Sequence, residues 1–168
     1  MSVVELVGEL ALRFGKDVYM KSLEPIFMHY LTNTAASVRE MGIKKVAFMA
    51  ISFKSDWVMN SFLPKIVETY AIEKQGFNFR MACLMSLSAV MPALQKDQIS
   101  EKVIPTLVLA CSDKIPNVQF CVARIIKANK SLIDPGVLNS QIVPKLKDMT
   151  QDGDKDVAYF ATIALYND

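Results

Sequence analysis

Four prolines recur along the chain in similar apolar surroundings. Pro25, Pro64, Pro105 and Pro144 lie 39, 41 and 39 residues apart, within the strings LEPIF, FLPKI, VIPTL and IVPKL. The positions two before and two after each proline are apolar in all four strings. A spacing of four places such a pair on one helical face, so the pattern predicts a helix around each proline. Because proline lacks a backbone donor, we expect a kink or a break there.

A second apolar stripe follows each proline and predicts a partner helix. Its members recur at i, i+4 and i+8: Val38, Gly42, Val46; Phe79, Cys83, Leu87; Val118, Val122, Ile126; and Val157, Ala161, Leu165. The middle column is small or modest in size, which is typical of helices that approach closely. We expect Ser37, Asn117 and Asp156 to cap these second helices, and Asp134 with Pro135 to open the last first helix.

A helix, a short polar turn and a second helix therefore repeat about every 39 residues, which indicates an α-solenoid. We predict an all-α armadillo-like superhelix with about nine helices and no strand. The single array, 1–168, would comprise a half repeat, 1–15, and complete repeats 16–53, 54–95, 96–133 and 134–168. Residues 2–14 resemble a second helix without its partner, so we expect the C-terminal part of a longer protein.

Composition and charge exclude several classes of protein. Apolar residues make up 52% of the chain, which excludes a disordered protein. A net charge of +2 gives no electrostatic case for nucleic acid. No apolar run reaches the ~20 residues that cross a bilayer, and Glu5 and Glu9 argue against a secretory signal. Three cysteines without CxxC spacing favour a reducing compartment, the cytoplasm and also the nucleus.

The sequence offers no convincing catalytic group. His29 is the one histidine, and the string IFMHYL favours a packed or half-exposed structural histidine over a general base. Cys83, Cys111 and Cys121 lie on helix faces and are expected to be inert buried thiols. Most of the ten methionines, Met85 among them, lie in apolar runs and are interpreted as core. We therefore predict a protein that is not an enzyme and that holds no metal and no cofactor.

The edge formed by the turns between first and second helices is the candidate binding surface. In a solenoid such turns stack into a ridge, which suits an extended protein partner. The second turn is two residues longer than the third and fourth and carries Phe77 and Phe79 beside Arg80. Aromatic residues and arginine dominate interface energetics. Phe79 also fills a core column, and Arg39 and Arg80 are equally suited to brace neighbouring turns.

The period and the Pro…D…V-R pattern resemble HEAT repeats. The stretches IPTLVLACSDKIPNVQFCVARIIKANKSLID and VPKLKDMTQDGDKDVAYFATIAL resemble the last two repeats of the scaffold (A) subunits of protein phosphatase 2A. The stretch ELALRFGKDVYMKSLEPIFMHYLTNTAASVREMGIKKV resembles the repeats before them, and the run TQDGDKDVAYFA is the most specific match. The resemblance implies a non-catalytic scaffold whose turn ridge holds the phosphatase catalytic subunit. Regulatory subunits would bind N-terminal repeats that this chain lacks, and neither nucleic acid nor membrane is implied.

Carried over by position, the resemblance implies partner contacts at each turn: Ala36 and Arg39, then Phe77 and Arg80, then Ile115, Asn117 and Gln119, then Tyr159 and Phe160. Ala36 is small where the family has an aromatic residue, and Gln119 stands in place of an arginine. These departures imply a diverged catalytic subunit or weaker binding. Another HEAT adaptor, of the transport-receptor or microtubule-associated type, is the alternative interpretation.

Overall fold

Helices make up the secondary structure of the computed structural model, which describes residues 3–72 and 76–166. No strand occurs in those two ranges. Helices of the first and second type alternate along the chain and are joined by short turns. The predicted all-α solenoid is therefore confirmed, whereas the boundaries of the individual repeat units stay a prediction.

The second helices are α-helical, and the second of them, α4, continues past a kink at Lys54 into the next first helix. They are α1 (Val3–Phe14), α4 (Ala36–Trp57), α6 (Phe77–Val90), α9 (Pro116–Asn129) and α12 (Lys155–Tyr166). Their apolar stripes face the first helices, and the small members of the middle column, Gly42 and Ala161, are buried. A Cβ added at Gly42 would lie 2.9 Å from Cδ2 of Leu31. A side chain at residue 42 would therefore force the Leu31 side chain to move where α4 packs against the preceding first helix.

The first helices are composites of three segments. In chain order they are α2 (Lys16–Val18), a π-helical turn (Tyr19–Leu23) and α3 (Glu24–Leu31); the end of α4, a π-helical turn (Val58–Phe62) and α5 (Leu63–Ala71); α7 (Lys96–Gln98), a π-helical turn (Ile99–Val103) and α8 (Ile104–Ala110); and α10 (Pro135–Val137), a π-helical turn (Leu138–Ile142) and α11 (Val143–Met149). The same composite thus occurs in all four.

The π-helical turns show how the repeat prolines fit inside helices. Each proline is the second residue of the α-helical segment that follows such a turn. The residue before the proline donates its N–H to the carbonyl five residues earlier, as Glu24 does to Tyr19. An ordinary α-helix would bring the proline ring against the carbonyl four residues before it, and the wider turn relieves this clash. Of the expected kink or break, the break is absent because the helical backbone continues through each proline, and the regular α-helix is interrupted instead by the π-helical turn.

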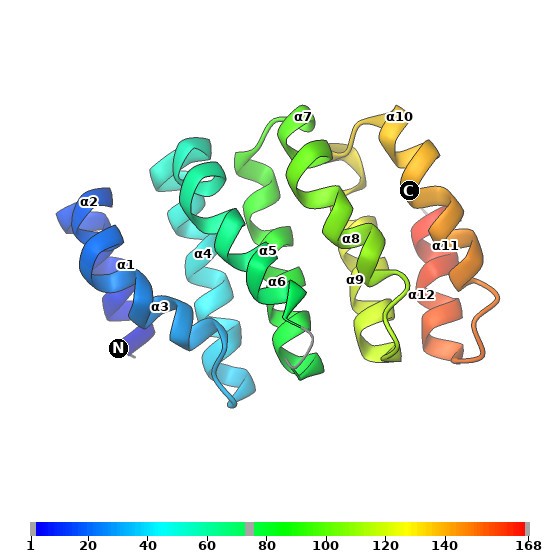
Figure 1. Ribbon diagram of the computed structural model, residues 1–168, viewed down its shortest axis with the longest axis horizontal. Helices are drawn as coiled ribbons and strands as arrows, with labels where there is room; N and C mark the ends of the chain where they lie inside the picture. The colour runs from blue at the N-terminus through cyan, green and yellow to red at the C-terminus, as the bar shows by residue number, and fades with distance from the viewer. Residues whose placement is uncertain (1–2, 73–75, 167–168) are drawn as a thin grey trace.

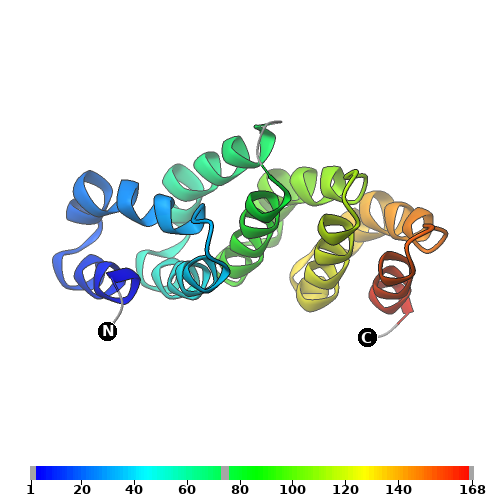
Figure 2. The same cartoon turned by 90° about the horizontal axis from the view of Figure 1, so that it is seen from below.

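The helices stand in chain order from one end of the molecule to the other (Figure 1). First helices form one layer and second helices the other, as the end-on arrangement in Figure 2 shows. The core lies between the layers, where the column two residues after each proline, Phe27, Ile66, Leu107 and Leu146, is buried throughout. The apolar columns of the sequence thus correspond to one continuous core.

Aromatic side chains concentrate in the N-terminal part of this core. Tyr19 lies edge-to-face on Phe27 and on Trp57, with ring centroids 6.2 and 5.8 Å apart. Phe53 and Phe62 contact Trp57 at 5.6 and 5.1 Å. Edge-to-face and tilted contacts of this kind add to the stabilisation from burial. The cluster joins three successive helices of the array.

Two kinds of joint connect one repeat to the next. Gly15 (φ 82°, ψ 175°) and Lys54 (φ 62°, ψ −176°) each turn the chain with a single residue. The later joints are longer 3₁₀ turns, Met91–Ala93 and Lys130–Leu132. After the last of them, the Asp134 carboxylate accepts hydrogen bonds from two backbone N–H groups of α10. The predicted cap at Asp134, followed by Pro135, is confirmed.

Within the described residues, the helices are too short or too polar to cross a lipid bilayer.

Candidate protein-binding ridge and groove

The turns between first and second helices lie along one edge of the array, the lower edge in Figure 1. A side-chain oxygen at the same place in three of them accepts a hydrogen bond from a backbone N–H two residues on: Asn33 from Ala35, Asp113 from Ile115, and Asp152 from Asp154. Such bonds fix the direction in which the second helix leaves the turn. The corresponding part of the second turn, residues 73–75, lies outside the described residues.

The predicted caps of the second helices, Ser37, Asn117 and Asp156, each lie two residues beyond the observed cap position. Ala35 precedes α4 and Ile115 precedes α9, so Ser37 and Asn117 lie inside the first turn. At α12 the carboxylate of Asp154 accepts from the N–H groups of Asp156 and Val157. The turn oxygens described above organise the chain before the helix begins, so a polar residue is not needed at the predicted cap positions.

The nine ridge candidates differ in how far solvent reaches them. Ala36, Phe77, Asn117 and Tyr159 are exposed, whereas Arg39, Arg80, Ile115, Gln119 and Phe160 are half-buried. Phe77 is 38% exposed at the start of α6, and Tyr159 is 60% exposed in the first half of α12. These two aromatic side chains are therefore accessible to a partner along the ridge.

Both ridge arginines brace turns. Arg39 Nη1 donates to the carbonyls of Asn33 and Thr34, both at 2.8 Å, within its own repeat. Arg80 donates from Nε and Nη2 to the two carboxylate oxygens of Asp113, at 2.8 and 3.0 Å, and so ties α6 to the next turn. Bidentate pairs of this geometry are the strong ones. The expected bracing of a neighbouring turn is thus observed for Arg80, whereas Arg39 braces its own turn, and a partner-binding role for either arginine stays a prediction.

Phe160 belongs to a small aromatic group that joins α9 to α12. Its ring centroid lies 5.7 Å from that of Phe120 and 5.3 Å from that of Tyr159. The Arg124 guanidinium carbon lies 5.4 Å from the Phe160 ring centroid, a cation–π contact. Truncation of Phe160 would therefore disturb helix packing as well as the surface.

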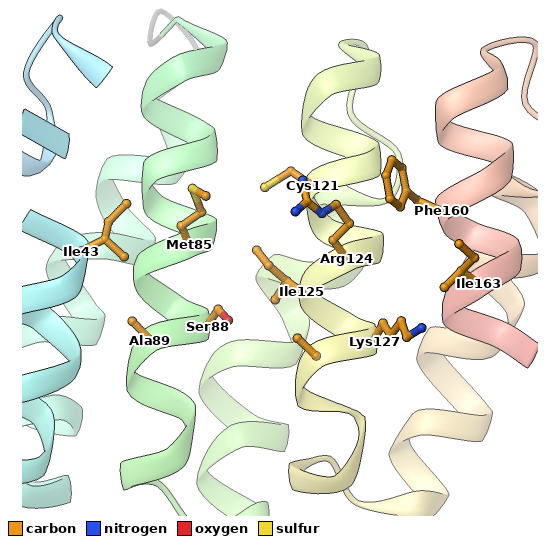
Figure 3. A pocket seen from close by; sticks show the side chains of 11 residues that line it. Ile43, Met85, Ser88, Ala89, Cys121, Arg124, Ile125, Lys127, Phe160 and Ile163 are labelled. Carbon is orange, nitrogen blue, oxygen red and sulfur yellow. The ribbon is translucent and has the colours of Figure 1, made fainter. Parts of the chain in front are cut away.

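A groove of about 850 Å³ lies on the layer of second helices (Figure 3). Its lining residues come from α4, α6, α9 and α12: Ile43, Met85, Ser88, Ala89, Cys121, Arg124, Ile125, Lys127, Ala128, Phe160 and Ile163. A smaller hollow of about 190 Å³ shares Ile43 and Met85 with it and reaches Ala36 and Arg39 near the ridge. The smaller hollow, which Glu40 of α4 also lines, thus adjoins the groove on the side of the turns.

The expectation that Met85 is a core residue is wrong, because its side chain is 41% exposed in this groove. The spacing along α6 already indicates that Met85 lies outside the core. The buried stripe of α6 runs through Cys83 and Leu87, and Met85 lies halfway between them, on the opposite face of the helix. Helical periodicity therefore outweighs the apolar character of the local run.

The groups considered for catalysis are dispersed. Among the described residues there is no group of three or more His, Cys, Asp and Glu side chains able to hold a metal ion. His29 is exposed, rather than packed or half-exposed as expected. The three cysteines are buried, as predicted, and burial raises the pKa of Cys83 and of Cys111 to about 12 and that of Cys121 to about 11. Thiols with such pKa values are poor nucleophiles near neutral pH.

Comparisons with known proteins show which sequences this chain is similar to. No protein-family model matches the chain. The protein phosphatase 2A (PP2A) regulatory A subunit of Saccharomyces cerevisiae is 28% identical over 120 residues, which are 67% of this chain and 19% of that protein. The protein of the same name from Schizosaccharomyces pombe is 31% identical over 61 residues, 36% of this chain and 10% of that protein. The matched part is thus less than a fifth of the length of either relative.

A solved structure shows the same fold. The crystal structure of Cex1p superposes with a TM-score of 0.72 at 14% identity, over 97% of this chain and 32% of that one. At this identity the likeness concerns the fold alone. Sequence and fold together thus show an α-solenoid that is similar in sequence to parts of the regulatory A subunits of protein phosphatase 2A.

Proposed function

We propose that this chain is a non-catalytic scaffold that binds the catalytic subunit of a protein phosphatase 2A-type serine/threonine phosphatase along the ridge of turns. The observation that carries the proposal is the similarity to two regulatory A subunits of this phosphatase. The dispersal of His29 and the buried thiols supports a role in binding rather than in turnover.

The exposed aromatic residues of the ridge are the proposed anchors. Phe77 is the first residue of α6 and Tyr159 the fifth residue of α12, so both lie in the halves of these helices that are nearer the turns. An exposed aromatic side chain offers a large apolar contact area for a partner and loses little conformational entropy on binding. Ala36, Ile115, Asn117 and Gln119 would form the surrounding contacts, and the arginines would hold the turns in register.

A binding titration of the full chain with a purified phosphatase 2A-type catalytic subunit tests the proposal. We expect Phe77→Ala and Tyr159→Ala each to weaken binding about tenfold, the effect of losing a moderate anchor. Tyr166→Ala is the matched control, because Tyr166 lies two turns further along α12, is 74% exposed and is remote from the ridge. The melting temperature of each variant should stay close to that of the wild type.

Two results would contradict the proposal. One is an absence of measurable affinity for the catalytic subunit, which would favour another HEAT adaptor function. The other is an equal loss of affinity in Tyr159→Ala and Tyr166→Ala, which would locate the contact away from the turns. Regulatory subunits are proposed to bind other repeats of the complete scaffold, and we propose neither a nucleic acid nor a membrane as partner.

A further inference from the structure

The groove between α6, α9 and α12 is a surface whose centre lies away from the ridge, although the ridge candidate Phe160 also lines it. Met85 and Ile125 lie near the middle of α6 and α9, well away from the turns, and neither Phe77 nor Tyr159 lines the groove. Its floor is mostly apolar, with Ile43, Ala89 and Ile163 half-buried and Met85 and Ala128 exposed. A flexible thioether on such a floor can adapt to side chains of different shape. The groove can therefore accept an apolar side chain from outside.

The charges around this floor have one sign. Arg124 and Lys127 are exposed at its edge, and none of the described residues that line it is acidic. The two central helices, α6 and α9, contain no aspartate or glutamate at all. The acidic residues of this part of the chain lie outside the groove lining: Asp97 and Asp113 on a first helix and a turn, and Glu40 and Asp156 near the starts of α4 and α12. A hollow lined by one sign of charge concentrates ligands of the opposite sign.

We propose that the groove binds an acidic amphipathic peptide segment of a partner protein. An apolar side chain of the segment enters the hollow over Met85 and Ile125, and flanking aspartate or glutamate side chains pair with Arg124 and Lys127. This arrangement is the helix-in-groove mode of recognition, in which apolar anchors give affinity and charge gives orientation. The inference goes beyond the proposed phosphatase scaffold and does not depend on it.

The floor of the groove favours a peptide over a nucleic acid. Single-stranded nucleic acids bind where exposed aromatic faces stack bases beside a track of cations. Phe160 is the one aromatic residue that lines this groove, and its ring is already in contact with Arg124 and Phe120. The aliphatic floor offers phosphates no partner. The combination of apolar floor and basic edge therefore complements an acidic amphipathic segment.

Fluorescence anisotropy with synthetic peptides tests the proposal on the full chain. The probe is a labelled helical peptide of about four turns with Leu and Phe on one face and Glu on the other. One comparison peptide has Lys in place of Glu, and a second has Ser in place of Leu and Phe. We expect binding of the acidic amphipathic peptide alone, and a loss of about tenfold or more in Met85→Ala and in Lys127→Glu.

Lys147→Glu is the matched control, because Lys147 is an exposed lysine of α11 in the layer of first helices. Its affinity for the acidic peptide should stay within about twofold of the wild type. Circular dichroism melts establish that all variants fold. An equal loss in Lys147→Glu would overturn the proposal, because binding would then follow overall charge.

Further outcomes overturn it as well. The groove is not a peptide site if the wild type fails to bind the acidic amphipathic peptide, or binds the serine peptide equally well. If a poly(U) oligonucleotide binds more tightly than the acidic amphipathic peptide and this binding is lost in Lys127→Glu, the occupant is a nucleic acid. Self-association that is abolished by Met85→Ala and Lys127→Glu would make it a second copy of this chain.

Discussion

Lys54 holds a backbone conformation that side chains other than glycine rarely adopt. Its φ of 62° and ψ of −176° match those of Gly15, which lies 39 residues earlier at the same kind of joint. Such a conformation costs roughly 1–3 kcal/mol for a residue with a Cβ. We expect Lys54→Gly to stabilise the protein by about 1 kcal/mol in urea-induced unfolding, since glycine loses some of the gain through its more flexible unfolded state.

Lys54→Ala separates this backbone effect from the loss of charge. Alanine keeps the Cβ, so its free energy of unfolding should stay within about 0.5 kcal/mol of the wild type. If alanine stabilises as much as glycine, the lysine charge and not the backbone is responsible.

The buried thiols make stability fall at alkaline pH. Burial raises the pKa of Cys83 and Cys111 from 9.0 to about 12 in the folded state. Above pH 9 the unfolded chain releases these protons while the folded chain retains them, so stability present below pH 9 is lost as the pH rises toward 12. We expect a loss on the order of 1 kcal/mol per thiol by pH 10, measured by urea unfolding. A Cys83→Ala and Cys111→Ala double variant should lose less between pH 8 and 10, and an equal loss would contradict the assignment.

Between elements, the Arg80–Asp113 pair ties one repeat to the next. Its side chains are 18% and 10% exposed, so removal of Arg80 leaves a largely desolvated carboxylate without its guanidinium partner. We expect Arg80→Ala to lower the free energy of unfolding by roughly 2 kcal/mol. In a double-mutant cycle with Asp113→Asn, the coupling should reach about 1 kcal/mol. If the two effects are simply additive, or if Arg80→Ala lowers only the affinity for the phosphatase catalytic subunit, Arg80 is an anchor rather than a brace.

At this same scale, periodicity predicted the elements well and their ends less well. The repeat positions equivalent to Phe27 in the first helices and to Gly42 in the second helices predicted both helix types and the core. They could do so because burial imposes helical spacing on the sequence. The caps at Ser37 and Asn117 were wrong because Asn33 and Asp113 bond the backbone outside the helices. The groove around Met85 was missed because it arises between helices of different repeats, which no single stretch of sequence encodes.

Across the whole molecule, each helix packs mainly against neighbours in the array. The second helix α9, for example, packs chiefly against α6, α8 and α12. We expect Ile126→Ala, a truncation of a fully buried side chain in α9, to cost about 2–5 kcal/mol and to act locally. Hydrogen exchange should show a loss of amide protection in α9 and α12, with α1 and α3 little changed. A uniform loss across all helices would show instead that the array unfolds as one cooperative unit.

The aromatic cluster also contains an intrinsic fluorescence probe of unfolding. Trp57 is the one tryptophan of the chain and is fully buried against Tyr19, Phe53 and Phe62, so its emission reports on the N-terminal part of the core. Circular dichroism, in contrast, averages over every helix. In a solenoid the fluorescence and circular dichroism signals need not change together during unfolding. A difference between their midpoints would show whether the N-terminal part unfolds before or after the average of all helices. The order in which the array comes apart can therefore be followed without attaching a label.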